Sequence, residues 1–370
     1  MKLSTLIAAC AALTVSPVLA GDLTPPPGPV GPTMKTLTEV EPRIPIQSLP
    51  GGGTFQHVIS EPGSYYLTSD LVASAGGITG IAVFAPNVTI DLNGFTLQGA
   101  GPQGQGAAAV SLAGTPGCTV RNGRIDGWVV GVQAAGSTNC VIRDLTVSNG
   151  GEGIQGSAVV IERCHAVGLS VGFRFFENGL ISDSTARDCS FGFVCRASTV
   201  IRCAAESCGT GFNSFGAAHF ESCKASASGI GFEAFGSGAT LTNCTASASF
   251  LGFTMERSST LTNCSAFGGT TGFRVIDRCV LRGCTSTEAS QSGFEVPLIT
   301  GTGFNTFEDC VATNAPTGFS IVSDAGRNLI IRCRAISPAP FVVRPNDHLA
   351  PVLSPADLAT NTNPNANLGF

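Results

Sequence analysis

The hydrophobic positions of this chain repeat with a period of about twenty residues. Eight Gly-Phe pairs follow this period, and a small apolar residue, most often cysteine, lies eight positions before most of them. The repeat is plainest in LTNCTASASFLGF and LTNCSAFGGTTGF, which begin at Leu241 and Leu261. The pairs begin at Gly172, Gly192, Gly211, Gly231, Gly252, Gly272, Gly293 and Gly318. A fixed period of this length predicts stacked supersecondary units.

Each unit predicts short β-strands and sharp turns. Its apolar residues alternate with polar ones over short segments that Gly, Asn, Asp and Ser interrupt. A unit of this length is too short to contain a crossover helix between parallel strands. The residue before the recurring cysteine is often one that tolerates the left-handed backbone of a sharp corner, as at Asn243, Asn263, Asp309, Asp183 and Gly283. The pattern therefore predicts an all-β coil with three short strands per turn.

Stacking at about 4.8 Å per turn places equivalent residues above one another. The phenylalanines should form one internal column: Phe173, Phe193, Phe212, Phe232, Phe253, Phe273, Phe294 and Phe319. The cysteines should form a second: Cys164, Cys203, Cys223, Cys244, Cys264 and Cys310, with Cys284 one residue out of step and Ser184 in place of one cysteine. Each turn buries its apolar face only against its neighbours, which explains why the chain repeats itself.

The ends of the chain differ from the repeat. Residues 1–20 have a lysine, an apolar stretch and a small-residue site after Ala20, which predicts a cleaved export signal and a secreted, periplasmic or cell-surface protein. A lipoprotein signal ending at Cys10 is the alternative. We expect a Pro-rich linker at 21–32, a capping region with the first rung at 33–75, the β-helix at 76–337, and a C-terminal cap or tail at 338–370.

Composition narrows the function. Only 12% of the residues are charged, the net charge is −5 without long runs, and there are three Lys and four His. The charges form no basic cluster of the kind that binds nucleic acid. No second apolar run is long enough for a transmembrane segment. Residues for acid–base chemistry are scarce. Oligomeric state is left open.

Two N-terminal stretches and a leader carry a family resemblance. The resemblance is to exported bacterial right-handed parallel β-helix repeat proteins, the pectin-lyase-like architecture. Their first rungs resemble EPGSYYLTSDL and NVTIDLNGFTLQG, and the leader before those rungs resembles TMKTLTEVEPRIPI. The resemblance covers residues 33–337 and implies a right-handed parallel β-helix; with the repeat length we expect about 10–12 rungs of 20–21 residues. It implies no activity, because this architecture carries lyases, hydrolases, epimerases, adhesins and inert scaffolds.

The catalytic motifs of that architecture are missing. The aspartate cluster, Gly-His-Gly and Arg-Ile-Lys of polygalacturonase-like enzymes do not occur, nor does the Asp-Pro-His of alginate epimerases. The clustered acidic ligands of pectate lyases are absent as well. Glu233 and Glu256 are the catalytic candidates, because they lie one rung apart on a predicted exposed face. The alternative is that both are solvated surface acids.

One outward strip is the predicted ligand site. Strand alternation turns outward the first and third residues after each internal phenylalanine. The candidates are Arg174, Phe176, Arg196, Asn213, Phe215, Glu233, Phe235 and Arg274. Exposed rings beside polar groups suit an extended sugar chain. The alternative is a kinked strand that tucks Phe176, Phe215 and Phe235 under a loop.

We therefore predict an exported, non-catalytic scaffold that contacts a polysaccharide or another surface polymer along one sheet. A polysaccharide lyase or glycoside hydrolase with an unfamiliar site, and a purely structural envelope protein, are the alternatives.

The fourteen cysteines outside the signal are predicted mainly as core residues, because free cysteine packs as a small hydrophobe. A metal or iron–sulfur column is the alternative, but CxxC pairs and clustered histidines are absent, so we expect no metal and no cofactor. Cys118–Cys140 and Cys189–Cys208 are candidate disulfides, since each pair would stack at a corner. In-register parallel neighbours orient poorly for a bridge, so both pairs stay candidates and neither is assigned as a bond.

Overall fold

The computed structural model describes residues 43–101, 108–112, 114–323, 326–354, 356–357 and 360–370. Three predicted segments lie outside this part: the signal at 1–20 with Cys10, the linker at 21–32, and the first ten residues of the capping region. The described chain has one short 3-10 helix, η1 (Ile46–Ser48), and is otherwise built of strands and turns, so the all-β prediction is confirmed.

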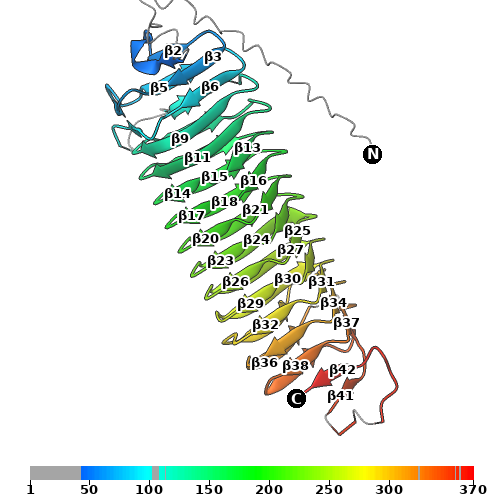
Figure 1. Ribbon diagram of the computed structural model, residues 1–370. Coiled ribbons are helices and arrows are strands. Elements are labelled where there is room, and N and C mark those ends of the chain that lie inside the picture. Colours follow the sequence, from blue (N-terminus) through cyan, green and yellow to red (C-terminus); the bar gives the residue numbers. More distant parts are fainter. Residues whose placement is uncertain (1–42, 102–107, 113, 324–325, 355, 358–359) are drawn as a thin grey trace, which may run out of the picture. The chain divides into compact units, whose positions relative to one another are not determined.

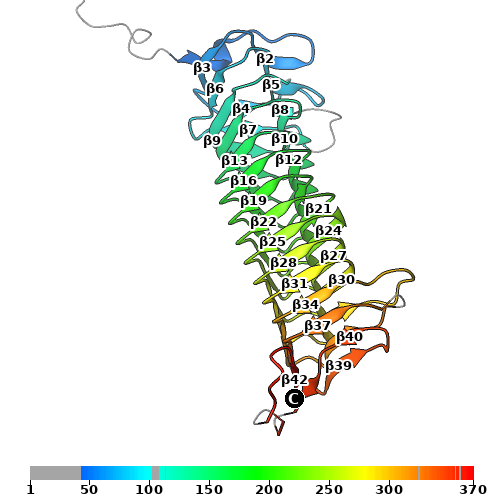
Figure 2. The ribbon, with the colours of Figure 1, turned by 90° about the vertical axis from the view of Figure 1, so that its right-hand side faces the viewer.

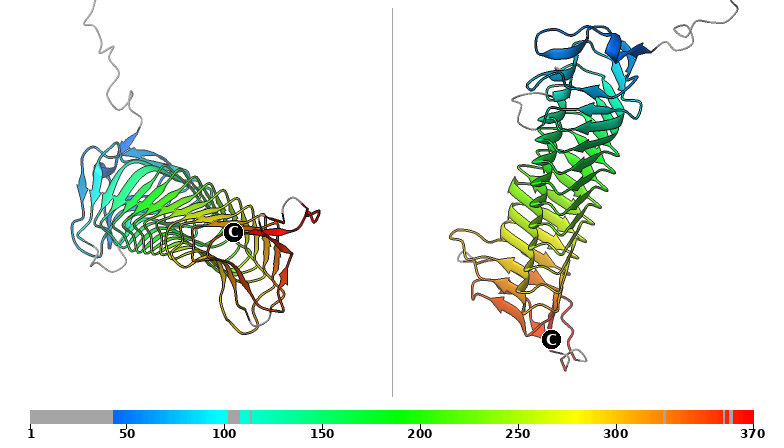
Figure 3. Two further views of the ribbon diagram at one scale, coloured as in Figure 1. Left: turned by 90° about the horizontal axis from the view of Figure 1, so that it is seen from below. Right: turned by 90° about the vertical axis from the view of Figure 1, so that its left-hand side faces the viewer.

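The unit from Arg43 to Phe370 is a parallel β-helix in which each turn contributes up to three short strands (Figure 1). One strand per turn joins a fourteen-strand sheet, and the other two join a twenty-eight-strand sheet that bends at a corner (Figure 2). All pairings between named strands are parallel, and successive turns lie one behind another when seen from below (Figure 3).

The fourteen-strand sheet contains β2 (Phe55–Ile59), β5 (Thr79–Val83), β8 (Ala108–Ser111), β10 (Val130–Ala134), β12 (Glu152–Gly156), β15 (Val171–Phe175), β18 (Phe191–Cys195), β21 (Thr210–Ser214), β24 (Ile230–Ser237), β27 (Leu251–Arg257), β30 (Thr271–Asp277), β33 (Ser292–Val296), β36 (Thr317–Ile321) and β39 (Ala339–Val343).

The twenty-eight-strand sheet has two series. The strands before the corner are β1 (Ile44–Pro45), β3 (Gly63–Tyr66), β6 (Val88–Asp91), β9 (Thr119–Asp126), β11 (Val141–Ser148), β13 (Val160–Glu162), β16 (Leu180–Ser182), β19 (Thr199–Ile201), β22 (His219–Glu221), β25 (Thr240–Thr242), β28 (Thr260–Thr262), β31 (Val280–Arg282), β34 (Thr306–Glu308), β37 (Leu329–Ile331) and β40 (His348–Leu349). Both β9 and β11 continue past the corner.

The strands after the corner are β4 (Leu71–Val72), β7 (Thr96–Gln98), β14 (His165–Val167), β17 (Thr185–Arg187), β20 (Ala204–Glu206), β23 (Lys224–Ser226), β26 (Thr245–Ser247), β29 (Ser265–Phe267), β32 (Thr285–Thr287), β35 (Val311–Thr313), β38 (Arg334–Ile336) and β42 (Asn367–Gly369), with β41 (Val352–Leu353) beside β42.

The predicted phenylalanine column is confirmed. Phe253 is fully buried, and its ring stacks on Phe232 at 4.8 Å and on Phe273 at 4.7 Å between centroids. The stack runs from Phe173 to Phe319 and gains a ninth ring, Phe341, at 5.0 Å. Aliphatic residues occupy the same column in the preceding turns: Ile81, Val110, Val132 and Ile154.

The glycine of each Gly-Phe pair has a steric reason. A Cβ at Gly192 would lie 2.6 Å from the carbonyl oxygen of Gly211 in the next turn, and a Cβ at Gly252 would lie 2.5 Å from that of Gly272. Real Cβ contacts are longer than this, so any side chain would push the turns apart. Glycine at this position is required by the close approach of two backbones.

The cysteine column is also buried, and its corner has the predicted backbone. Cys203, Cys244 and Cys264 are at most 1% exposed. Asp183, Asn243, Asn263, Gly283 and Asp309 all have a positive φ between 52° and 60°. Ser184 fits the column because its hydroxyl donates a hydrogen bond of 2.8 Å to the carbonyl of Ser182. This small polar exception is therefore satisfied within its own turn.

The coil has about fourteen turns, so the expectation of 10–12 rungs was too low. The repeat signal failed at both ends for one reason. At the position of the column phenylalanine, the turn with β2 has His57 and the turns with β5 and β8 have Ile81 and Val110, while the turn with β39 has Pro340 where the glycine would be. Strand pairing persists there without the motif, and β39 continues the ladder beyond residue 337.

Two irregular segments flank the last turns. Residues 297–305, between β33 and β34, form a protruding loop, and Leu298 is 56% exposed (Figure 2). After β40 the chain returns so that β42 pairs with β38. Asn367 then caps the cysteine column, because its Oδ1 accepts a 2.8 Å hydrogen bond from the Cys333 amide and its Nδ2 donates to the Ile330 carbonyl.

Candidate functional site

The outer face of the fourteen-strand sheet holds the predicted ligand residues. Two columns run along it across six turns. We call the residues three positions after the six internal phenylalanines from Phe173 to Phe273 the outer strip: Phe176, Arg196, Phe215, Phe235, Glu256 and Ile276. The residues one position after the same phenylalanines form the central column: Arg174, Val194, Asn213, Glu233, Thr254 and Arg274. Neighbouring strands therefore bring all eight predicted site residues onto one face.

The aromatic residues of the outer strip are exposed, as alternation predicted. Phe176, Phe215 and Phe235 are 40%, 54% and 37% exposed, so the alternative in which a loop covers them is wrong. The rings of Phe215 and Phe235 stack at 5.8 Å between centroids with an interplanar angle of 18°. Two aligned rings on adjacent turns present a continuous apolar platform to solvent, which a folded protein seldom exposes without a partner.

Asn213 differs from the prediction. It was expected in the exposed strip, but it is fully buried. Its side chain is shorter than that of Glu233, its strand partner in the next turn. The Asn213 Nδ2 donates a 2.8 Å hydrogen bond to Glu233 Oε2, whereas its Oδ1 is buried without a hydrogen-bond partner. The residue positions the glutamate from beneath the surface.

The charged groups of this face fall into paired and unpaired sets. Arg174 forms an ion pair of 3.0 Å with Glu152, and Arg274 lies 3.8 Å from Glu295. Neither carboxylate was among the predicted site residues, although Glu295 is the direct strand partner of Arg274. Within the described residues, the Arg196 guanidinium has no ion-pair partner. A Cβ at Gly216 would lie 3.7 Å from Arg196 Cγ, so the stem of this side chain passes over Gly216.

A surface pocket of about 260 Å³ opens beside the outer strip. Its outward lining consists of Arg174, Phe176, Val194, Arg196 and Phe215. The pocket therefore combines two rings with two guanidinium groups. A flat apolar group of a ligand can pack on the aromatic rings that form one wall. The two guanidinium groups can donate hydrogen bonds to hydroxyl or acidic groups of the same ligand.

Glu233 and Glu256 are the only carboxylates of the two columns. Partial burial raises the pKa of the Glu233 carboxyl, the hydrogen bond from Asn213 opposes this shift, and the Glu256 carboxylate raises the pKa further. A carboxyl with a raised pKa can act as an acid at a higher pH than an ordinary glutamate. Both side chains are half-buried and reach the same face.

The cysteines show no bridge. All fourteen cysteines of the described residues are buried free thiols, so neither Cys118–Cys140 nor Cys189–Cys208 is formed in the structure. Each pair is stacked as expected, and the amide of Cys118 lies 3.3 Å from Cys140 Sγ. The equivalent side chains of stacked parallel turns point the same way, which is unfavourable for an S–S bond. Burial raises the pKa of Cys203 to about 12, which keeps its thiol protonated.

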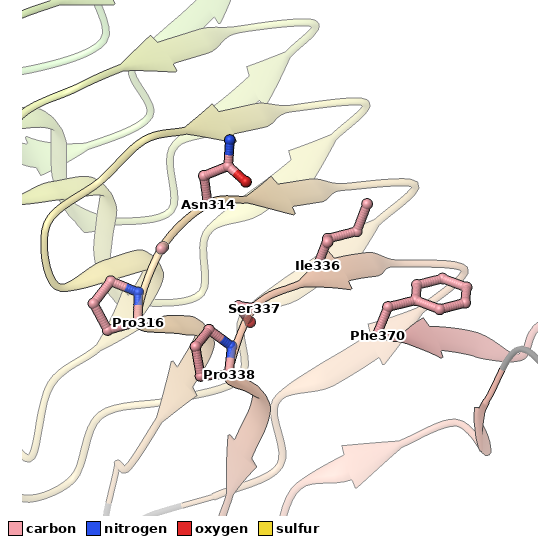
Figure 4. A pocket seen from close by; sticks show the side chains of 7 residues that line it. Asn314, Pro316, Ile336, Ser337, Pro338 and Phe370 are labelled. Carbon is pink, nitrogen blue, oxygen red and sulfur yellow. The ribbon is translucent and has the colours of Figure 1, made fainter.

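Other concave sites offer less chemistry. A pocket of about 640 Å³ is lined by Asn314, Ala315, Pro316, Ile336, Ser337, Pro338 and Phe370, and none of these side chains titrates (Figure 4). A second, of about 340 Å³, lies over β14, β17 and β20, where Arg187 and Glu206 already pair. Within the described ranges, no cluster of three or more His, Cys, Asp or Glu could hold a metal ion.

The same described ranges contain no helix with the length and apolar character that a membrane span requires.

Comparison with known proteins identifies the architecture. Residues 195–335 match the family model described as a right handed beta helix region. The matched residues lie within the parallel coil, so the right-handed parallel β-helix fold that the resemblance implied is confirmed. No curated protein matches the chain by sequence.

Solved structures share the fold at low identity. The catalytic unit of a GH87 α-1,3-glucanase from Streptomyces thermodiastaticus is 12% identical, with a TM-score of 0.49 over 74% of this chain and 62% of that one. The tailspike protein of E. coli bacteriophage HK620 with a pentasaccharide is 10% identical (TM-score 0.41; 88% and 70%). An exopolygalacturonase from Thermotoga maritima is 11% identical (0.38; 72% and 80%). The chain spans under two thirds of the glucanase unit, and these likenesses concern the fold alone.

Proposed function

We propose that the protein is an exported scaffold that holds an extended polysaccharide on the outer face of the fourteen-strand sheet without cleaving it. The observation that carries this proposal is the pair of stacked, exposed rings of Phe215 and Phe235 beside a pocket lined by Phe176 and Arg196. Sugar rings present flat patches of C–H groups that pack on aromatic faces, and their hydroxyls accept hydrogen bonds from guanidinium groups.

The geometry suits a polymer more than a single sugar. The turns repeat at about 4.8 Å, close to the length of one sugar unit, so the outer strip offers successive contacts along one line. The pocket of about 260 Å³ is open to the strip and does not enclose a ligand. The export part of the proposal rests on residues 1–20, which lie outside the described residues.

Binding is tested with the full chain by affinity electrophoresis and calorimetry against acidic and neutral polysaccharides. Phe215→Ala combined with Phe235→Ala should abolish binding and change the free energy of unfolding by less than about 1 kcal/mol, as expected for surface sites. The matched control is Phe250→Ala with Phe267→Ala, because those rings are 63% and 51% exposed but lie outside the outer strip.

The control pair should leave binding intact. Unchanged binding in the Phe215 and Phe235 variant would refute the site. A large loss of stability in that variant would show that the rings serve the fold.

Cleavage is the second candidate, and the raised pKa of Glu233 favours it. If the face hydrolyses the polymer that it binds, the wild type should release reducing ends. Glu233→Gln should then bind the polymer without releasing any, because the amide cannot donate the proton as an acid.

A further inference from the structure

Apolar and charged residues alternate in the same order from both ends of the outer strip, with opposite signs of charge. Reading along the coil, it presents Phe176, Arg196, Phe215, Phe235, Glu256 and Ile276. The midpoint lies between the stacked rings of Phe215 and Phe235, next to a shift in strand register between Ala234 and Ser237. At equal numbers of turns from this midpoint, a cation on one side corresponds to an anion on the other, and an apolar residue corresponds to an apolar residue.

The two charged members are unpaired in the protomer. In the described part of the chain, neither Arg196 nor Glu256 has an ion-pair partner, unlike Arg174 and Arg274 on the same face. Three turns separate them, a distance of about 14 Å at about 4.8 Å per turn, so they are too far apart to pair with each other. The strip therefore presents one uncompensated charge of each sign.

We propose that a second copy of this chain packs on the outer strip with its coil antiparallel. A two-fold axis along the strand direction, through the midpoint, places Arg196 opposite the partner's Glu256 and Glu256 opposite the partner's Arg196. Phe215 then meets the partner's Phe235, which forms a cluster of four rings at the centre. A parallel arrangement would instead place each charge against its own kind, so charge complementarity selects the antiparallel one.

The surface dimensions fit such an interface. Six turns at about 4.8 Å and strands of five to seven residues at about 3.3 Å give a flat area of about 600 Å². A standard interface buries about 800 Å² per partner, so the strip with its flanks is close to that size. Arg174 would face the partner's Arg274, but each has its own carboxylate at 3.0 and 3.8 Å.

Self-association would regulate the polymer site, and this part rests on the proposed function. The rings that pack in the dimer are the rings that we propose bind the polysaccharide. Polymer and second copy therefore compete for one surface, so the binding face is covered and unavailable to polymer in the dimer.

Sedimentation velocity over a concentration series, with light scattering after gel filtration, tests the dimer. Wild type should form dimers, whereas Arg196→Glu alone and Glu256→Arg alone should remain monomers under the same conditions. Mixing these two variants should restore a dimer, because both contacts then join opposite charges. Arg124→Glu is the control, since Arg124 is also exposed and without an ion pair in the described residues but lies on β9. Circular dichroism checks that each variant is folded.

The outcomes separate the two claims. A wild type that stays monomeric at every concentration, or a mixture that stays monomeric, overturns the antiparallel dimer. Polymer that dissociates the wild-type dimer supports competition, and polymer that binds the intact dimer refutes it. If no polymer binds even the monomeric Glu256→Arg variant while the wild type dimerises, the proposed function fails and the dimer stands.

Discussion

Removing one ring from the internal phenylalanine column should cost a large part of the stability. Phe253 is fully buried and stacks on two rings, at 4.8 and 4.7 Å. Burying about 150 Å² of aromatic surface at about 25 cal/mol per Å² corresponds to about 4 kcal/mol. Core Phe→Ala substitutions cost about 3–5 kcal/mol, and the loss of two ring contacts places Phe253→Ala in the upper part of that range.

The free energy of unfolding is measured by urea titration with circular dichroism detection. Phe267→Ala is the matched control, because the same atoms are removed from a ring that is 51% exposed. The control should stay within about 0.5 kcal/mol of the wild type. The turns stabilise one another, so Phe253→Ala should also broaden the transition. A loss below about 1 kcal/mol would show that the column is loosely packed and that the reasoning is wrong.

Three further predictions follow from buried polar and titratable groups. Cys244→Ser should cost less stability than Cys244→Ala, because the serine hydroxyl can donate to the Thr242 carbonyl, now 3.5 Å from Sγ; equal losses in urea titrations would contradict this. The raised pKa of Glu233 means that the native state holds more protons than the unfolded state above the ordinary glutamate pKa. Stability should therefore fall as the pH rises through the window between the two pKa values, and Glu233→Gln should remove that fall in urea titrations from pH 4 to 8. Alkylation of the denatured, unreduced chain followed by mass spectrometry should label every cysteine from Cys118 to Cys333; a missing pair would reveal a bridge.

The fold was predictable because each turn repeats one pattern of burial. The recurrence of phenylalanine and cysteine at fixed offsets determined which residues stack, and the structure confirms those columns. The number of turns was not predictable in the same way. At the N-terminal end, Ile81 and Val110 fill the same column without a recognisable motif, because any apolar side chain of suitable size can pack there.

The sequence predicted which side chains of the site face outward, but not how deeply each of them is buried. Alternation places Phe176, Phe215 and Phe235 outward, and they are exposed. Alternation says nothing of how far neighbouring side chains rise above a short one, so it could not show that Asn213 is covered. The ion pair between Arg174 and Glu152 was also missed, since it joins two different columns of the sheet.

The glycines of the Gly-Phe pairs have a consequence for how the protein changes in evolution. Each of these glycines lies against the backbone of the next turn, so the contact does not depend on which turn follows. A gain or loss of one whole turn leaves the same backbone contact on either side. Duplication or deletion of a DNA segment of about sixty base pairs, the coding length of one repeat unit, can therefore lengthen or shorten the outer face while the cross-section stays constant.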